Sequence, residues 1–190
     1  MKQQIRILGI DDSPFEFGDG RSLVVGVLMR APAYIEAVMK TEVTVDGSDA
    51  TAQLVGMVSR SRYREQIHAI MLDGIALAGF NVVDIESLHA SLGIPVVTVT
   101  RDPPDYGRIE VALRKHFDDW GDRLDLIKRL DLVEIETPHK PLYACGLGLG
   151  PAELRELVGI STVREVLPEP VRAAHLIASA MVRGESRGRS

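Results

Sequence analysis

Two aspartates each close a short run of apolar residues. Asp11 ends the run that begins at Ile5, and Asp73 ends the run that begins at His68. Such runs are typical of buried strands, and neighbouring strands that end at one edge of a sheet bring these side chains close together. Carboxylates placed in this way can hold Mg²⁺ or Mn²⁺, which prefer oxygen ligands. Phosphodiester hydrolysis is the matching chemistry, because metal ions can generate the attacking hydroxide and stabilise the leaving oxyanion.

Residue type alone also permits an ordinary structural interpretation. An aspartate followed by glycine, as at Asp73 and Gly74, is common in turns that bind no ligand. Asp12 adjoins Asp11, and the alternation of side chains along a strand predicts that Asp12 points to the opposite face. We therefore expect Asp12 to cap a neighbouring segment or to support a metal ligand.

Length and composition favour one intracellular domain. The chain has 190 residues, of which 45% are hydrophobic, and this size favours a single domain over residues 1–183 with a disordered polar tail at 184–190. Cys145 is the only cysteine, which excludes an internal disulfide and a thiolate zinc cluster. A run of eighteen or more apolar residues and a leader pattern are both absent, so we expect a cytoplasmic protein that does not bind a membrane.

The formal net charge of −5 argues against a protein that coats nucleic acid. It does not exclude a nuclease, because carboxylates gathered around a metal ion make the sequence more acidic than the loaded enzyme. Positive charge concentrates at Arg60, Arg62 and Arg64, with Tyr63 between them. These arginines are candidates for DNA contact, and a solvated helix surface is the alternative interpretation.

The elements that must position these groups begin with three strands. Apolar and β-branched runs predict strands at 5–11, 22–30 and 33–45, joined as an antiparallel meander. A turn signature at 46–49 precedes a helix expected over 50–66. Strands at 68–72 and 94–100 enclose a helix at 83–92, which forms the parallel half of a mixed sheet.

The remainder of the chain is richer in helix. We expect helices at 109–117, 123–130, 150–158 and 168–182, and strands at 132–137 and 142–145. The order β-β-β-α-β-α-β followed by helices is the wiring of the ribonuclease H-like fold. The predicted fold class is therefore α/β with a ribonuclease H-like mixed sheet.

Several blocks of sequence resemble a known family. Residues 70–101 resemble the central block of endonuclease V, residues 168–176 (PEPVRAAHL) resemble its C-terminal segment, and residues 9–11 fit its first strand. Closer still, residues 46–51 and 79–84 resemble endonuclease dU, an archaeal family of endonuclease V relatives. The resemblance covers nearly the whole chain.

The resemblance implies roles for individual residues. Asp11 and Asp73 would be metal ligands for Mg²⁺ or Mn²⁺, and His175 would be the active-site histidine contributed by the last helix. Without that context, a lone histidine on an alanine-rich helix would be an ordinary core or surface residue. An imidazole beside metal-bound carboxylates could position the attacking water or bind the metal through a neutral nitrogen.

Two features depart from the endonuclease V pattern. The family has a glutamate at the start of the helix before the Asp-Gly strand, and here the best substitute is Asp49, with Asp46 second. The strand-separating aromatic-proline wedge is not visible, and Arg101 stands where the family has a lysine. We therefore expect metal geometry and lesion recognition to differ, with Arg101 among the DNA contacts.

A pocket for a flipped base is a further candidate. Gly74, Gly79 and Phe80 could form it, although Gly-Phe between a strand and a helix is as often a packing turn. The first hypothesis is a metal-dependent endodeoxyribonuclease of DNA repair that nicks DNA near uracil or hypoxanthine. The alternatives are an RNA-directed endonuclease and a non-catalytic protein of the same fold that binds nucleic acid or nucleotides; the oligomeric state is left open.

Overall fold

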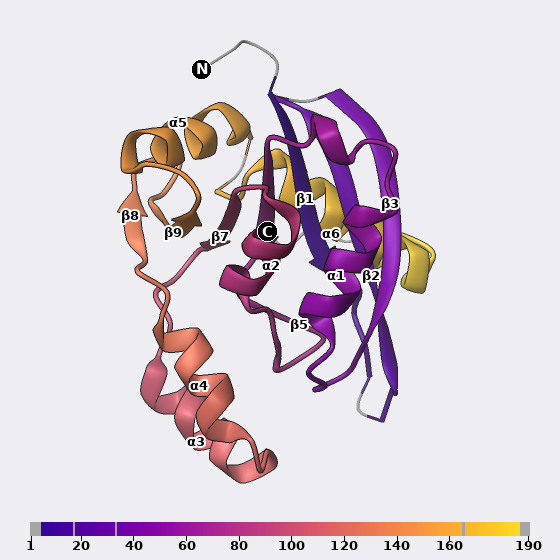
Figure 1. The fold of residues 1–190 in the computed structure, drawn as a ribbon, viewed down its shortest axis with the longest axis vertical. Coiled ribbons are helices and arrows are strands. Elements are labelled where there is room, and N and C mark those ends of the chain that lie inside the picture. Colours follow the sequence, from indigo (N-terminus) through magenta and orange to yellow (C-terminus); the bar gives the residue numbers. More distant parts are fainter. Residues whose placement is uncertain (1–4, 17, 33, 165, 187–190) are drawn as a thin grey trace.

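The computed structural model describes residues 5–16, 18–32, 34–164 and 166–186. Its centre is a seven-stranded mixed sheet of order β3-β2-β1-β4-β7-β9-β8 (Figure 1). The strands of this sheet are β1 (Arg6–Asp12), β2 (Arg21–Arg30), β3 (Tyr34–Thr44), β4 (Ala69–Asp73), β7 (Val96–Thr100), β8 (Val133–Ile135) and β9 (Leu142–Leu147). The helices are α1 (Ala50–Ser59), α2 (Ile85–Leu92), α3 (Tyr106–His116), α4 (Trp120–Lys128), α5 (Pro151–Ser161) and α6 (Glu169–Arg183).

The antiparallel meander and the parallel pair of strands that the sequence predicts are both present in the sheet. Strands β1, β2 and β3 form an antiparallel meander, and β4 joins β1 in parallel with Ile10 opposite Leu72. Strand β7 pairs in parallel with β4 and antiparallel with β9, which itself pairs with β8. The expected tail begins beyond α6, and its residues 187–190 lie outside the described residues.

One local prediction was wrong, and one small element was missed. The helix expected over 50–66 ends at Ser59, and a short 3₁₀ turn, η1, follows at Arg64–Gln66. The Ser61 hydroxyl accepts a hydrogen bond from the Tyr63 N–H, a local bond of the kind that competes with helix. A small hairpin of β5 (Ala76–Leu77) and β6 (Asn81–Val82) was not expected, because two-residue strands are too short to show alternation.

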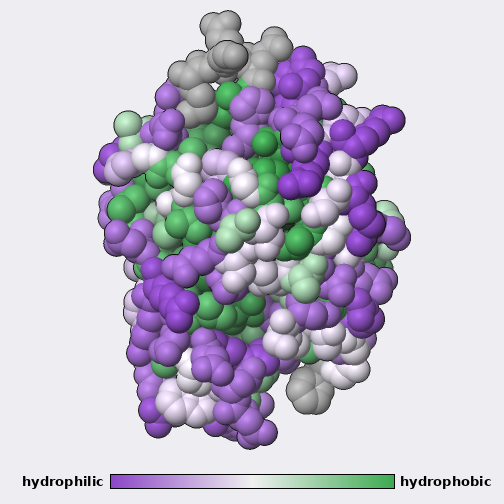
Figure 2. Space-filling model, in the orientation of Figure 1, coloured by the Kyte–Doolittle hydropathy of each residue, from purple (hydrophilic) through white to green (hydrophobic). Residues whose placement is uncertain are grey.

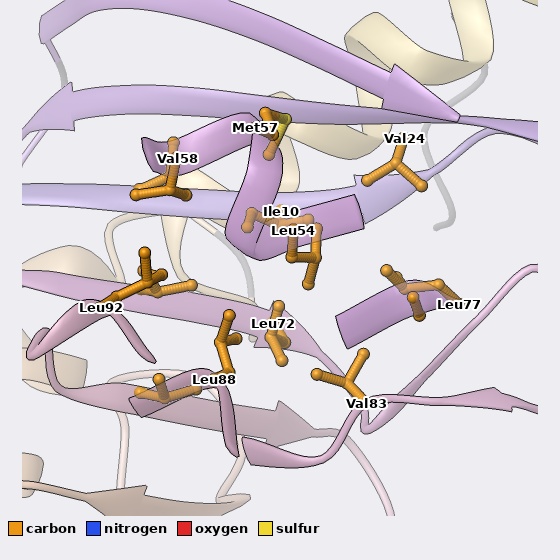
Figure 3. Packing of buried hydrophobic residues seen from close by; sticks show 14 of the residues in the cluster. Ile10, Val24, Leu54, Met57, Val58, Leu72, Leu77, Val83, Leu88 and Leu92 are labelled. Atoms are coloured by element: carbon orange, nitrogen blue, oxygen red, sulfur yellow. The ribbon is translucent and has the colours of Figure 1, made fainter. Parts of the chain in front are cut away.

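Helices cover both faces of the sheet. On one face, α1 and α2 pack on the strands, and Figure 3 shows Leu54 and Leu88 of these helices around Ile10 and Leu72 of the sheet. On the other face lie α5 and α6, with α6 seen behind the sheet in Figure 1. The central strands β1, β4 and β7 are therefore buried on both sides, and their polar side chains lie mainly at their ends.

One glycine sets how closely α6 approaches β1. A Cβ atom at Gly9 would lie 2.1 Å from the carbonyl carbon of Pro170, at the start of α6. Real Cβ atoms do not tolerate such a distance to backbone, so only glycine permits this approach. The helix consequently runs directly over β1, and the side chains of its second turn reach the end of that strand.

Helices α3 and α4 form a hairpin that extends below the sheet in Figure 1. Arg123 of α4 joins this hairpin to the rest of the molecule. Its Nη1 donates to the carbonyl oxygens of Asp46 (3.0 Å), Gly47 (2.9 Å) and Phe80 (2.6 Å). The guanidinium also stacks over the Phe117 ring, at 4.2 Å from its centroid. One nearly buried cation therefore satisfies three carbonyls from two separate segments.

We expect Arg123→Met to loosen the hairpin before the sheet unfolds, because three carbonyl groups lose a charged donor, at a cost of about 2–4 kcal/mol. Trp120, the only tryptophan of the chain, lies at the start of α4 and reports on the hairpin. In urea titrations, Trp120 fluorescence should change at a lower concentration than the far-ultraviolet circular dichroism. Arg108→Met, which changes an exposed arginine on α3, is the matched control. If both signals of Arg123→Met change together and at the wild-type urea concentration, Arg123 does not hold the hairpin to the sheet.

Candidate active site

An aspartate and a histidine 164 positions apart meet at one end of β1. His175 Nδ1 lies 2.7 Å from Asp11 Oδ2, and the Asp11 side chain is buried. Asp11 sits near the end of β1, and α6 is brought over that strand by the close approach at Gly9. The hydrogen bond holds the imidazole ring against the carboxylate and fixes its orientation.

Asp73 lies at the same edge and on the same face. Ile10 of β1 is opposite Leu72 of β4, so Asp11 and Asp73, one residue further along parallel strands, are neighbours. Side chains at matching positions of parallel strands point to the same face. The two aspartates that the sequence singles out are therefore brought together on the α6 side of the sheet.

Asp12 points to the opposite face, as expected from strand alternation. Its Oδ2 accepts a hydrogen bond from the N–H of Ala78, in the β5–β6 turn, at 3.1 Å. Burial, together with the negative charges of Asp11 and Asp73, raises the pKa of Asp12 to about 7, against the lowering effect of the Ala78 bond. The pKa shift indicates that negative charge accumulates at this strand end.

The Asp12 pKa predicts a dependence of stability on pH. The folded state binds the Asp12 proton more tightly than the unfolded state, so this contribution is present below the ordinary pKa of 3.8 and is lost as the pH rises through about 7. Asp12→Asn removes the charge and can still accept from Ala78. Without metal, the variant should gain stability over the wild type between pH 4 and 8, reaching about 1–3 kcal/mol. Denaturation across that range tests this, and a pH-independent difference would contradict it.

Asp49, predicted as the substitute for the family glutamate, holds the loop before α1. Its Oδ1 accepts from the Thr44 N–H (3.0 Å) and from Asn81 Nδ2 (2.7 Å), and its Oδ2 from the Thr44 hydroxyl (3.0 Å). Burial alone would raise the pKa of Asp49, but these hydrogen bonds lower it overall. Asn81 also accepts from the N–H of Ala50 at 2.9 Å, which joins β6 to the start of α1.

Asp46, the second substitute, supports the turn between β5 and β6. Its φ is 54°, and its Oδ1 accepts from the Phe80 N–H at 2.9 Å. A Cβ atom at Gly79, whose φ is +88°, would lie 2.2 Å from the same oxygen, so glycine is required there. Both aspartates therefore have structural tasks, and a role for either as a metal ligand stays a prediction.

The described part of the chain contains no group of three or more His, Cys, Asp or Glu side chains placed to hold an ion together. A donor set of Asp11 and Asp73 nevertheless fits Mg²⁺, which commonly keeps several waters and binds through one or two carboxylates. Burial is the main cause of the raised pKa of Asp12, and the charges of Asp11 and Asp73 add to it, which is consistent with carboxylates gathered at this strand end. A divalent cation at this edge would relieve that repulsion.

The three residues expected to form a base pocket line one cavity. Gly74, Gly79 and Phe80 border a space of about 240 Å³ between the ends of β4 and β7 and the α3–α4 hairpin. Phe80 packs edge-on against Phe117 of the hairpin, with ring centroids 5.8 Å apart. In Figure 2, apolar residues are visible just above the hairpin, with hydrophilic residues beside them.

Sequence reasoning missed the far wall of this cavity. Ile109, Ile127 and Leu130 complete it from the α3–α4 hairpin and the segment that follows. These residues show only the apolar spacing of ordinary helices, so no local signal marks them. Arg123 was missed for the same reason, although an arginine on a face otherwise occupied by Leu124 and Ile127 is a weak indication of burial.

The predicted arginines lie at two opposite edges of the sheet, where an edge means the side at which one end of the central strands lies. Arg60, Arg62 and Arg64 precede β4 and therefore lie at the edge opposite Asp73. Strand β4 has 5 residues, which separates the two edges by about 16 Å. Arg101 directly follows β7, whose Val99 is opposite Asp73, and so lies at the same edge as the aspartates.

Comparison with known proteins gives consistent results. A family model described as "Endonuclease dU" matches residues 3–182. A UPF0215 protein of Methanothermobacter thermautotrophicus is 45% identical over 189 residues, which cover 99% of this chain and 93% of the relative.

Two solved structures resemble the fold. A protein of unknown function from Archaeoglobus fulgidus has a TM-score of 0.84 and 39% identity, over 95% of this chain and 99% of that one. An endonuclease V of Ciona intestinalis, in complex with a 24mer DNA containing an inosine followed by a ribo-adenosine, has a TM-score of 0.57 and 13% identity, over 90% and 83% of the two chains. The predicted ribonuclease H-like fold is thereby confirmed.

Among the described residues, no helix has the length and apolar character needed to cross a bilayer.

Proposed function

The chain belongs to the endonuclease dU family, and on that premise we propose that it is a metal-dependent endonuclease that cleaves DNA near a deaminated base. The family and the endonuclease V-like fold support a nuclease. The observation that carries the finer proposal is the contact of His175 with Asp11, at an edge shared with Asp73. A histidine locked to one of two adjacent carboxylates is suited to proton transfer beside a cation.

In the proposed mechanism, Asp11 positions His175. When Nδ1 donates a hydrogen bond to Asp11, the neutral imidazole carries its basic lone pair on the other ring nitrogen, Nε2. Nε2 can then accept a proton from the attacking water, which is the role of a general base. Asp11 would also stabilise the imidazolium that results, because its carboxylate lies 2.7 Å from the ring.

Asp11 and Asp73 are the residues that would hold a divalent cation. When bound, such an ion supplies a lowered pKa for water and stabilisation of the charge on the leaving oxygen. Asp12, on the other face, would hold the β5–β6 turn through Ala78 and so position one wall of the cavity. Asp11 and Asp73 would thus bind the ion, and Asp12 would support recognition of the substrate.

The cavity that Gly74 borders would accept the damaged base. Base-acting enzymes turn the target nucleotide out of the stack into a fitted pocket. The cavity of about 240 Å³ has an aromatic ring in Phe80 and aliphatic walls, and Gly74 directly follows Asp73. A base held there would bring the adjacent backbone phosphates toward the carboxylates.

One assay tests the proposal. End-labelled duplex and single-stranded DNA, with uracil, hypoxanthine or no lesion, and a matching RNA are incubated with the protein and Mg²⁺, Mn²⁺ or EDTA. We expect a single nick in the damaged DNA strand that requires the cation and leaves the base in place. Cleavage of RNA alone would favour the RNA-directed alternative. Binding without cleavage under every condition would make the protein a non-catalytic member of its fold.

The arginines allow a test of where DNA lies. Arg101 shares the edge of Asp11 and Asp73, so Arg101→Ala should weaken DNA binding and flatten the slope of log affinity against log salt by about one unit. The variant with Arg60, Arg62 and Arg64 changed to Ala is the matched control, because these residues lie at the opposite edge. Its slope should stay unchanged. The reverse pattern in salt titrations would place the DNA on the opposite edge.

A further inference from the structure

One hydroxyl in the middle of the sheet has no partner among the described residues. Thr98 of β7 lies opposite Leu72 of β4 and Cys145 of β9, and it is 1% exposed. Its Oγ1 is buried and makes no hydrogen bond within the described part of the chain. A buried hydroxyl without a partner costs folding free energy, so such groups are rare in folded proteins.

The rest of β7 shows that the sheet does not require threonine here. The strand reads Val-Val-Thr-Val-Thr, and valine fills nearly the same volume as threonine without a polar atom. Thr100, two residues further on, uses its hydroxyl to donate to the carbonyl oxygen of Asp102 at 3.1 Å. Of the two threonine hydroxyls, one therefore holds the loop that follows β7, and the other bonds to none of the described residues.

Thr98 lines the same cavity as Gly74, Gly79 and Phe80. Apart from Thr98 and Thr100, the side chains that border this cavity are apolar. An apolar pocket with a small number of placed polar groups is the usual form of a binding site for a small organic group. Thr98 is thus one of two hydroxyl-bearing residues in the lining, and its hydroxyl is the one that no described group satisfies.

We infer that Thr98 is a specificity-determining residue, whose hydroxyl hydrogen-bonds the polar edge of a nucleobase that enters the cavity. The inference rests on the proposed function, because it assumes a nucleotide turned out of a DNA strand. A hydroxyl can donate and accept, so it can satisfy the carbonyl oxygen that deamination places on a base. The Phe80 ring offers a surface for stacking, and the aliphatic walls exclude water from the bond.

The test compares Thr98→Val, which removes the hydroxyl and keeps the shape, with Thr98→Ser, which keeps the hydroxyl. Binding is measured with Ca²⁺ in place of Mg²⁺, on a strand with uracil and on the same strand with a tetrahydrofuran abasic site at that position. The wild type should prefer the uracil strand. Thr98→Val should reduce that preference about five- to tenfold, the effect of one lost hydrogen bond, and Thr98→Ser should retain it.

Thermal unfolding without DNA separates recognition from structure. Thr98→Val should be as stable as the wild type or more stable, because it removes an unsatisfied buried hydroxyl. An unchanged uracil preference in Thr98→Val, an equal loss on both strands, or a wild type without preference would overturn the inference. Cleavage by the wild type with Mg²⁺ is measured in parallel. Its absence would overturn the proposed endonuclease, while the binding ratio would still decide the role of Thr98.

Discussion

Asp73→Asn is expected to abolish metal-dependent cleavage, with a loss of roughly a thousandfold or more in kcat. Asp73 and Asp11 are neighbours at one sheet edge, and Asp73 is one of the two carboxylates suited to hold the cation. An amide is a much weaker ligand for Mg²⁺ than a carboxylate. Stability without metal should hold or rise slightly, because the substitution removes one of the charges that raise the pKa of Asp12.

Single-turnover cleavage of labelled DNA and thermal unfolding in EDTA measure the two effects. The matched control is Asp118→Asn, which changes an exposed aspartate in the turn between α3 and α4. It should leave both cleavage and stability unchanged. If Asp73→Asn cleaves as well as the wild type, Asp73 is not a metal ligand and the proposed site is wrong.

Gly9→Ala should have the largest effect on the fold. The new Cβ would lie 2.1 Å from the carbonyl carbon of Pro170 and 2.2 Å from its carbonyl oxygen. Backbone cannot yield as a flexible side chain does, so α6 must move away from β1. We expect a loss of about 3 kcal/mol or more in the free energy of unfolding. Cleavage should fall as well, because His175 withdraws from Asp11.

Gly26→Ala, on the neighbouring strand β2, is the control for this prediction. Its Cβ would meet only side-chain atoms, the closest being Met39 Cγ at 3.0 Å, and these can adjust. We expect a cost below about 1 kcal/mol and normal cleavage. Urea denaturation of both variants gives the comparison, and equal stabilities would show that α6 does not require glycine at position 9.

Much of the fold could be predicted because its signals are local. The apolar runs that end at Asp11 and Asp73 identify two strands and the positions at which they end. Side-chain alternation then places Asp12 on the opposite face, where it accepts from Ala78. These features depend on the period of a strand, which a few consecutive residues are enough to show.

Only the tertiary structure decided which distant groups meet. The tasks of Asp49 depend on Thr44 and Asn81, and the contact of His175 with Asp11 depends on a glycine that lets a helix approach a strand. The edge to which the arginines belong depends on where α1 ends, which a local hydrogen bond in the turn at Ser61 helps to set.

The cavity shows most clearly that contacts between distant segments could not be predicted from the sequence. Gly74, Gly79 and Phe80 could be singled out from the sequence, but the walls contributed by the α3–α4 hairpin could not. Thr98 has the residue type of an ordinary strand position, and its hydroxyl becomes informative only when it is known to have no hydrogen-bond partner among the described residues. Hydrogen-bond partners and cavity walls are properties of segments far apart in the chain, and periodicity within one segment carries no information about them.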